Sequence, residues 1–325
     1  MNNIFAFTSD LLKIGFVFIG CILNTRAIFG ISRLGAAHLG DTLCGSTLPR
    51  LLNLVSDAMI FIDDCPITRA VFTGNPYVTG FKCGATVNLQ YRMRGNGHLI
   101  QRLEQGFDLP VSQIPRPEIY LSGNEKDWAV RFLEELRPSK PVCVLSTGAY
   151  TDGANVKRVD WESAVKVLKT QYTVVQAILN ESPVAGAVHV YKLSIRQYIS
   201  LISVTDCFMG GTSGGSHIAA AFDVPAIIVA WRDIIAKARF PISGLGIPAA
   251  FLYPQQWLLA WEDLWKGEFK QTALESVLSE IDALGGKCKP CYTTDGGHAN
   301  GILPEQPKMI ECLKERRLIV SRNWS

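Results

Sequence analysis

The order of apolar and polar positions along the chain predicts short buried strands that alternate with helices. Apolar runs bounded by polar or glycine-containing loops predict strands at residues 27–32, 58–62, 86–89, 142–146, 173–177, 207–209 and 226–230. Apolar residues at helical spacing predict helices at residues 42–54, 97–106, 125–136, 161–169, 194–204, 216–222 and 272–284. This alternation is typical of an α/β protein with parallel sheets, in which ligands bind beyond the carboxyl ends of the strands.

The alternation forms two series, which are separated by a polar segment with two prolines at residues 137–141. A chain of 325 residues is long enough for two domains with separate cores. We therefore expect two Rossmann-like domains, residues 26–137 and 142–284, that face each other across a cleft. Residues 1–25 are expected to form an apolar N-terminal extension, and residues 285–325 a cysteine-containing C-terminal tail.

Charge and cysteine usage narrow the class of protein. The 32 basic and 29 acidic residues give a net charge of +3, which does not indicate a nucleic-acid-binding surface. The nine cysteines are scattered without the spacing of a disulfide framework, so we expect the reducing environment of the cytoplasm. Cys288 and Cys291, with Cys312 further on, have part of the spacing of a metal site, but a zinc module needs a second close pair.

Residues 14–23 form an apolar run, which is too short for a membrane-spanning helix of about 20 residues. The first ten residues contain no Lys or Arg, whereas a signal peptide begins with basic residues. Three interpretations stay open: a helix docked on a membrane surface, a helix packed on the first domain, or an extension from a misassigned start codon. The first would place the protein peripherally at the inner face of a membrane.

A glycine-rich turn joins the strand at 207–209 to the helix at 216–222. The turn and the start of its helix comprise Gly210, Gly211, Thr212, Ser213, Gly214, Gly215, Ser216 and His217. Free backbone N–H groups at a helix N-terminus favour a bound phosphate, and the hydroxyls of the turn add further donors. The alternative is a tight turn whose glycines only allow close packing between helix and sheet.

Other polar residues fall at the same expected edge of the sheets. Asp41 stands where a loop meets a helix, and it is either an N-cap or a general base for an acceptor hydroxyl. Thr147 follows the strand at 142–146. Lys157 and Arg158 end the loop after that strand, and they are either a solvated pair or the partners of a diphosphate leaving group. No Asp-x-Asp pair stands at a strand end, so we expect chemistry without a divalent ion.

Three histidines allow both a structural and a functional interpretation. His38 and His98 lie in loops of the first domain, from which they could reach the cleft. His217 lies near the start of its helix, where a neutral imidazole can simply pack. For each of them the structural interpretation is the more common one, and the functional interpretation stays open.

Several motifs occur in an order that resembles a known family. Residues 33–43 and 47–52 form a first signature (RLGAAHLGDTL and TLPRLL), residues 74–77 and 116–121 form mid-domain landmarks (GNPY and RPEIYL), and residues 193–221 form a C-terminal motif. Together they are similar to the motifs of the family 9 glycosyltransferases, which include the ADP-heptose:lipopolysaccharide heptosyltransferases. The resemblance covers residues 26–232.

The resemblance implies a GT-B fold and an inverting, metal-independent transfer of a sugar from a nucleoside diphosphate sugar, with ADP-heptose as the suspected donor. It implies a cytoplasmic enzyme of lipopolysaccharide biosynthesis, whose acceptor is an envelope glycan, a lipid-linked glycan or a protein. The first domain would bind the acceptor, with His38 and His98 as acceptor-binding residues and Asp41 as the catalytic base. The second would bind the donor. The expected donor-binding residues are Thr147, Lys157, Arg158, Thr212, Ser213, Gly214, Gly215, Ser216 and His217.

The chain also departs from the family. Heptosyltransferases commonly carry Asp-Thr-Gly where this chain has residues 212–214 (Thr-Ser-Gly), and that aspartate contacts the donor sugar, so the sugar stays open. A second interpretation is a non-catalytic nucleotide-sugar or glycan-binding protein of the same fold. A nicotinamide-dependent oxidoreductase is disfavoured, because the loop at 34–41 lacks the Gly-x-Gly-x-x-Gly pattern.

Overall fold

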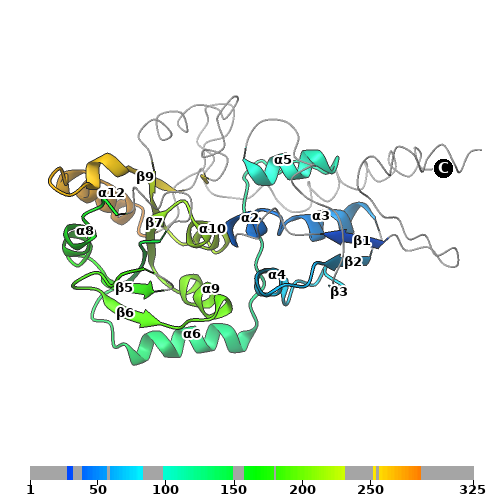
Figure 1. Ribbon diagram of the computed structural model, residues 1–325, viewed down its shortest axis with the longest axis horizontal. Coiled ribbons are helices and arrows are strands. Elements are labelled where there is room, and N and C mark those ends of the chain that lie inside the picture. The colour runs from blue at the N-terminus through cyan, green and yellow to red at the C-terminus, as the bar shows by residue number, and fades with distance from the viewer. Residues whose placement is uncertain are drawn as a thin grey trace, which may run out of the picture.

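The computed structural model describes two parallel sheets with helices packed on them (Figure 1). The residues that it describes are 28–31, 39–56, 59–82, 98–148, 157–178, 181–230, 252–253 and 256–286. The strand expected at 86–89 lies outside them. Among the described residues, no helix combines the length and the apolar character needed to cross a membrane.

The first sheet contains β1 (Ile28–Ile31), β2 (Met59–Ile62) and β3 (Gly80–Phe81), in that order and all parallel. Its helices are α2 (Leu39–Cys44), α3 (Leu48–Val55), α4 (Pro66–Phe72) and α5 (Leu99–Gly106). The strands expected at 27–32 and 58–62 are confirmed as β1 and β2. Because β1 and β2 are parallel neighbours, their carboxyl ends lie at one edge of this sheet.

The single helix expected at 42–54 is wrong, since the chain forms α2 and α3 with a turn between them. The Ser46 hydroxyl donates to the Leu43 carbonyl at 2.6 Å and accepts from the Glu118 N–H at 2.7 Å, which stabilises the turn. Pro49 lies in the first turn of α3, where its missing N–H costs no helical hydrogen bond. The break leaves α2 as a short helix with its own direction.

The second sheet has six parallel strands in the order β6-β5-β4-β7-β8-β9. They are β4 (Val142–Ser146), β5 (Thr173–Ile178), β6 (Val188–Tyr191), β7 (Cys207–Gly211), β8 (Ala226–Ala230) and β9 (Trp257–Ala260). Its helices are α6 (Gly123–Glu135), α8 (Trp161–Leu168), α9 (Ile195–Ser203), α10 (Gly214–Ala221), the 3-10 helix η3 (Trp261–Leu264) and α12 (Gln271–Ala283). β4, β7 and β8 are buried along their whole length, as strands covered by helices on both faces should be.

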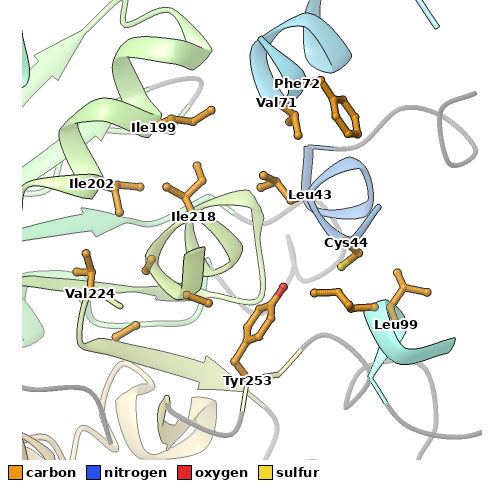
Figure 2. Close-up of a cluster of buried hydrophobic side chains, with 14 of the residues drawn as sticks. Leu43, Cys44, Val71, Phe72, Leu99, Ile199, Ile202, Ile218, Val224 and Tyr253 are labelled. Carbon is orange, nitrogen blue, oxygen red and sulfur yellow. The ribbon is translucent and has the colours of Figure 1, made fainter. Parts of the chain in front are cut away.

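Each face of the second sheet has its own apolar cluster. α8 and α12 cover one face, where Trp161 meets Trp261 edge-on with their ring centroids 6.4 Å apart. α9 and α10 cover the other face. That second cluster continues without interruption into the first half of the chain, because it also includes Leu48 of α3. Figure 2 shows two further members from that half, Leu43 of α2 and Leu99 of α5. The two sheets therefore share one core.

Arg196 connects the two halves of the chain through hydrogen bonds and an ion pair. Arg196 of α9 pairs with Glu125 of α6 through two hydrogen bonds of 2.6 Å, and it donates to the carbonyls of Ala70 at 3.0 Å and Tyr120 at 2.9 Å. These bonds connect the second sheet's α9 with the first half's α4 and with the segment between the sheets. The domain boundary at 137–141 stays a prediction, although α6, which precedes it in the chain, packs along α9.

Arg116 makes a second connection between the two halves, at the C-terminal end of α10. Its guanidinium donates to the Ala221 carbonyl at 2.9 and 3.2 Å and pairs with Asp223 at 2.6 Å. Asp223 adopts a left-handed backbone (φ 55°) just beyond the helix, which turns the chain toward β8. The C-terminal end of α10 is thus held by a residue from the first half.

Candidate active site at the junction of α2 and α10

The turn after β7 presents the N-terminus of α10 at the carboxyl edge of the second sheet. α10 begins at Gly214 with Ser213 as its N-cap, two residues earlier than the sequence predicts. The Ser216 hydroxyl accepts from the Ser213 N–H at 3.2 Å and donates to the Ser213 carbonyl at 2.7 Å. The Ser213 Oγ is buried and has no hydrogen-bond partner among the described residues. A buried hydroxyl without a partner at a helix N-terminus is a group to which a ligand oxygen can bind.

Two glycines at this N-terminus are required by close neighbours. A Cβ on Gly214 would lie 2.8 Å from Cδ2 of Leu39, and a Cβ on Gly215 would lie 2.5 Å from the Tyr198 hydroxyl and 2.6 Å from Cζ of Phe208. Real Cβ atoms do not approach this closely, so a larger residue at either position would have to displace these side chains. The sequence could not separate this packing role from a phosphate-binding role, and the structure shows that the packing role is present.

Asp41 lies beside this N-terminus. It occupies the first turn of α2, next to Leu39, which packs on Gly214, and next to Gly40, which packs on His217. Figure 1 shows α2 and α10 as neighbours at the centre of the molecule. The structure therefore places the expected base close to the glycine-rich turn, although Asp41 and Gly210 are 169 residues apart in sequence.

A buried polar cluster underlies this junction. The Tyr253 hydroxyl lies 2.5 Å from Nδ1 of His217, the Cys44 Sγ lies 3.7 Å from the same nitrogen, and the rings of His98 and Tyr253 have centroids 4.5 Å apart. Burial lowers the pKa of His217 to about 3. Burial also lowers the pKa of His98, and the neighbouring His217 lowers it further. Both imidazoles are therefore neutral at physiological pH. Burial raises the pKa of the Cys44 thiol and of the Tyr253 phenol, so these groups stay protonated.

His98 lies inside this cluster and is fully buried. Its Nδ1 accepts from the Ile100 N–H at 3.2 Å and so caps α5, while its Nε2 has no partner among the described residues. The expected acceptor-binding role of His98 stays a prediction. His217 is also buried, at 2% exposure, and meets α2 with one edge of its ring.

A second group of polar residues lies at the carboxyl ends of β4 and β5. The Gln176 amide donates to the Thr147 hydroxyl at 3.1 Å, and the Glu181 carboxylate lies so close to Gly148 that a Cβ there would be 1.9 Å from its Oε1. Burial raises the pKa of the Tyr198 phenol, a hydrogen bond with Ser146 lowers it, and the charge of Glu181 raises it. The charge of Glu181 thus acts on the Tyr198 hydroxyl, which borders the N-terminus of α10.

Sequence reasoning missed Glu181. The available signal was its position just beyond the second strand of the second series, where Rossmann-type sheets place the acidic residue that binds ribose hydroxyls. Nothing in the apolar pattern distinguishes this glutamate from the other acidic residues of surface loops.

Lys157 and Arg158 lie just before Val159, which forms an antiparallel bridge with Trp265. The Arg158 guanidinium stacks on the Trp265 ring, 3.6 Å from its centroid, and its carbonyl accepts from the Lys266 N–H at 2.9 Å. Lys157 is exposed beside it. The described contacts of Arg158 are thus with the segment after η3, and the donor-binding role of both residues stays a prediction.

Some expected site residues lie outside the described residues: His38, Cys288, Cys291 and Cys312. Within the part of the chain that the structure describes, no cluster of three or more His, Cys, Asp or Glu side chains is arranged to hold a metal ion.

The arrangement of the chain is similar to that of several solved glycosyltransferases. The glycosyl transferase family 9 protein from Veillonella parvula has a TM-score of 0.57 at 13% identity, over 79% of this chain and 96% of that one. The E. coli ADP-heptose lipopolysaccharide heptosyltransferase II has a TM-score of 0.54 at 14% identity, over 80% of this chain and 98% of that one. The chain has a GT-B fold. No family profile and no curated protein sequence matches it.

A third solved structure is similar at a lower TM-score. The heptosyltransferase TibC of enterotoxigenic E. coli, described as dodecameric and iron-containing, was solved in complex with ADP-D-β-D-heptose. That structure has a TM-score of 0.51 at 12% identity, over 81% of this chain and 77% of that one. In the present chain, α2 of the first half is in contact with α10 of the second sheet.

Proposed function

We propose that the protein is an inverting glycosyltransferase that transfers a sugar from a nucleoside diphosphate sugar. The observation that carries this proposal is the packing of the Asp41-bearing turn of α2 on the N-terminus of α10. This reaction needs a carboxylate that takes a proton and, close to it, a helix N-terminus that binds the leaving anion. The GT-B fold supports the proposal, because the solved structures that share it include heptosyltransferases.

The donor would bind across the carboxyl edge of the second sheet. The free N–H groups at the start of α10 and the unpartnered Ser213 hydroxyl would receive the diphosphate. Glu181 would accept hydrogen bonds from the ribose hydroxyls, and the exposed Lys157 would approach the diphosphate from the loop. We propose ADP-heptose as the first donor to test, with Thr212 as the residue that decides whether another sugar is preferred.

The reaction would proceed in one displacement. Asp41 takes the proton of the acceptor hydroxyl while the acceptor oxygen forms a bond to the anomeric carbon from the face opposite the diphosphate. The bond between that carbon and the diphosphate oxygen breaks, its electron pair leaves with the diphosphate, and the anomeric configuration inverts. The helix N-terminus stabilises the negative charge that develops on the leaving group. We propose that this step needs no divalent ion and that the acceptor is an envelope glycan, a lipid-linked glycan or a protein.

The decisive experiment has two stages. Thermal unfolding is first followed with ADP, UDP, GDP and their sugar conjugates, because a ligand at 100 times its Kd adds about 2.7 kcal/mol of apparent stability. The donor that binds is then incubated with acceptors of the three classes, with and without EDTA, and the product is identified by mass spectrometry. Binding without transfer or donor hydrolysis would favour a non-catalytic nucleotide-sugar-binding protein. Absence of binding to every nucleotide would overturn the proposal.

A further inference from the structure

The contact between His217 and Gly40 suggests how the position of Asp41 is fixed. An ideal Cβ on Gly40 would lie 2.9 Å from both Cδ2 and Nε2 of His217, so the edge of the ring rests directly on the backbone of α2. Asp41 is the next residue. The imidazole therefore packs against the backbone segment that carries the carboxylate.

Tyr253 holds this imidazole from its other edge. Its hydroxyl lies 2.5 Å from Nδ1, and its ring meets the His217 ring edge-on at a centroid distance of 5.3 Å. The Gln256 side chain accepts from the Tyr253 N–H at 3.2 Å and donates to the Ser216 carbonyl at 2.9 Å, which ties Tyr253 to α10 itself. Figure 2 shows the Tyr253 ring between α10 and the helix that carries Cys44.

The chemistry of the pair decides the tautomer of His217. A phenol is a stronger hydrogen-bond donor than a neutral imidazole N–H, and an imidazole nitrogen is a stronger acceptor than a phenol oxygen. Tyr253 therefore donates to Nδ1, which leaves the proton of the neutral ring on Nε2, at the edge that rests on Gly40. The Cys44 thiol, 3.7 Å from Nδ1, lies beside the same hydrogen bond.

We propose that Tyr253 and His217 are positioning residues for the transfer reaction, which hold the first turn of α2, and with it Asp41, against the N-terminus of α10. This inference rests on the proposed function, because Asp41 needs positioning only if it is the base. It extends that function to buried residues whose described contacts are with each other and with the backbones of α2 and α10. Misplacement of a catalytic group by about 1 Å costs about a hundredfold in rate, so the hydroxyl of one buried tyrosine can control turnover.

The test removes that hydroxyl alone. Tyr253→Phe is compared with Tyr172→Phe, which removes a hydroxyl from the other apolar cluster. We expect Tyr253→Phe to lower kcat by about ten- to a hundredfold with the donor Kd unchanged within about twofold, and Tyr172→Phe to change neither. A kcat equal to that of the wild type in a folded Tyr253→Phe protein would overturn the inference.

A second variant acts on the same contact from the other side. Gly40→Ala should displace the imidazole and reduce kcat in the same way, whereas Gly80→Ala is its control, because a Cβ at Gly80 would lie 3.6 Å from Phe61 in ordinary contact. If Gly40→Ala retained full turnover, the ring would have no role in placing Asp41.

The tautomer is measured without any donor or acceptor. In ¹⁵N–¹H correlation spectra of the wild-type protein, we expect the His217 proton on Nε2, and a mixture of tautomers in Tyr253→Phe. A proton on Nδ1 in the wild type would overturn the positioning role of Tyr253 and His217 and leave the proposed transferase activity intact. Conversely, the predicted tautomer in a protein that transfers no sugar would overturn the proposed function, and the positioning role with it.

Discussion

Leu39 of α2 packs on the α-carbon of Gly214, the first residue of α10, so closely that a Cβ there would lie 2.8 Å from Leu39 Cδ2. One residue further along α2, Gly40 makes room for His217 in the same way. The two helices thus interlock, each with a glycine that admits a side chain of the other. Because Asp41 follows directly, the position of the proposed base depends on contacts that cross from one sheet to the other.

Replacement of Asp41 by Asn should reduce sugar transfer by about 10²- to 10⁴-fold, because the amide cannot take the proton of the acceptor hydroxyl. Donor binding should be unchanged, since the α10 N-terminus is intact. Initial rates and the thermal shift with donor measure the two quantities separately. Asp64→Asn is the control, because Asp64 pairs with Arg69 at the surface and such pairs contribute little. A rate equal to that of the wild type in Asp41→Asn would exclude Asp41 as the base.

Replacement of Glu181 by Gln should weaken ADP binding by about tenfold, because hydrogen bonds to a carboxylate are worth about 1.5–3 kcal/mol and the amide offers one neutral acceptor. Inorganic pyrophosphate has no ribose, so its affinity should not change. Isothermal titration with both ligands makes the comparison, and Glu162→Gln, an exposed residue at the start of α8, is the control. Equal losses for ADP and pyrophosphate would show that Glu181 does not contact the ribose.

Replacement of Leu43 by Ala should destabilise both sheets together. Leu43 is fully buried in the core that contains residues of α3, α5, α9 and α10, and truncation of such a leucine costs about 2–5 kcal/mol. Amide hydrogen exchange should therefore become faster by a similar factor in β2 and in β7. If only β1 to β3 lost protection, the halves would be independent domains, as the linker at 137–141 suggests from the sequence.

Replacement of Glu125 by Gln should remove a pH-dependent part of the stability. The hydrogen bond from Arg196 lowers the pKa of Glu125 to about 2 from its ordinary 4.5 in spite of burial, so ionised Glu125 stabilises the folded state. This contribution is fully present above pH 4.5 and is lost as the pH falls toward 2.

The difference in unfolding free energy between wild type and Glu125→Gln should therefore be largest at pH 7 and should shrink steadily below pH 4.5. Urea unfolding at pH 7, 4 and 3 measures it, with the same buffers for both proteins. Other acidic groups titrate equally in both and cancel. A difference that is independent of pH would mean that the variant acts through packing and not through the ion pair.

The apolar pattern predicted the four central strands of the second sheet, which are almost entirely buried and largely apolar. β9 was not predicted, although its residues Trp257–Ala260 are apolar and mostly buried. β4, β5, β7 and β8 fall at the expected positions. β6 was missed, since this edge strand leaves Val188 and Tyr191 exposed and contains His189, so its apolar pattern is weak. α4 was missed as well, because it begins at Pro66 after a polar segment and is only seven residues long.

Individual site residues were predicted from local rules, whereas their neighbours were not. Asp41 and the turn at 212–217 stand out because a helix start and a glycine-rich loop have recognisable local chemistry. Tyr253 and Cys44 carry no such signal, and their meeting with His217 depends on the packing of α2 against α10. Contacts between residues so far apart in sequence are determined by the tertiary fold, which no local pattern encodes.

The attachment of α10 at both ends limits how this protein can be recombined with its structural relatives. Leu39 and Gly40 pack against the first turn of α10, and Arg116 binds the Ala221 carbonyl and the Asp223 carboxylate at its end. A donor-binding half taken from another GT-B protein would arrive without partners for these three residues. A working chimera would need to exchange α10 together with α2 and the Arg116 segment, so the unit of exchange in this protein is the interlocked pair of helices and not the Rossmann half.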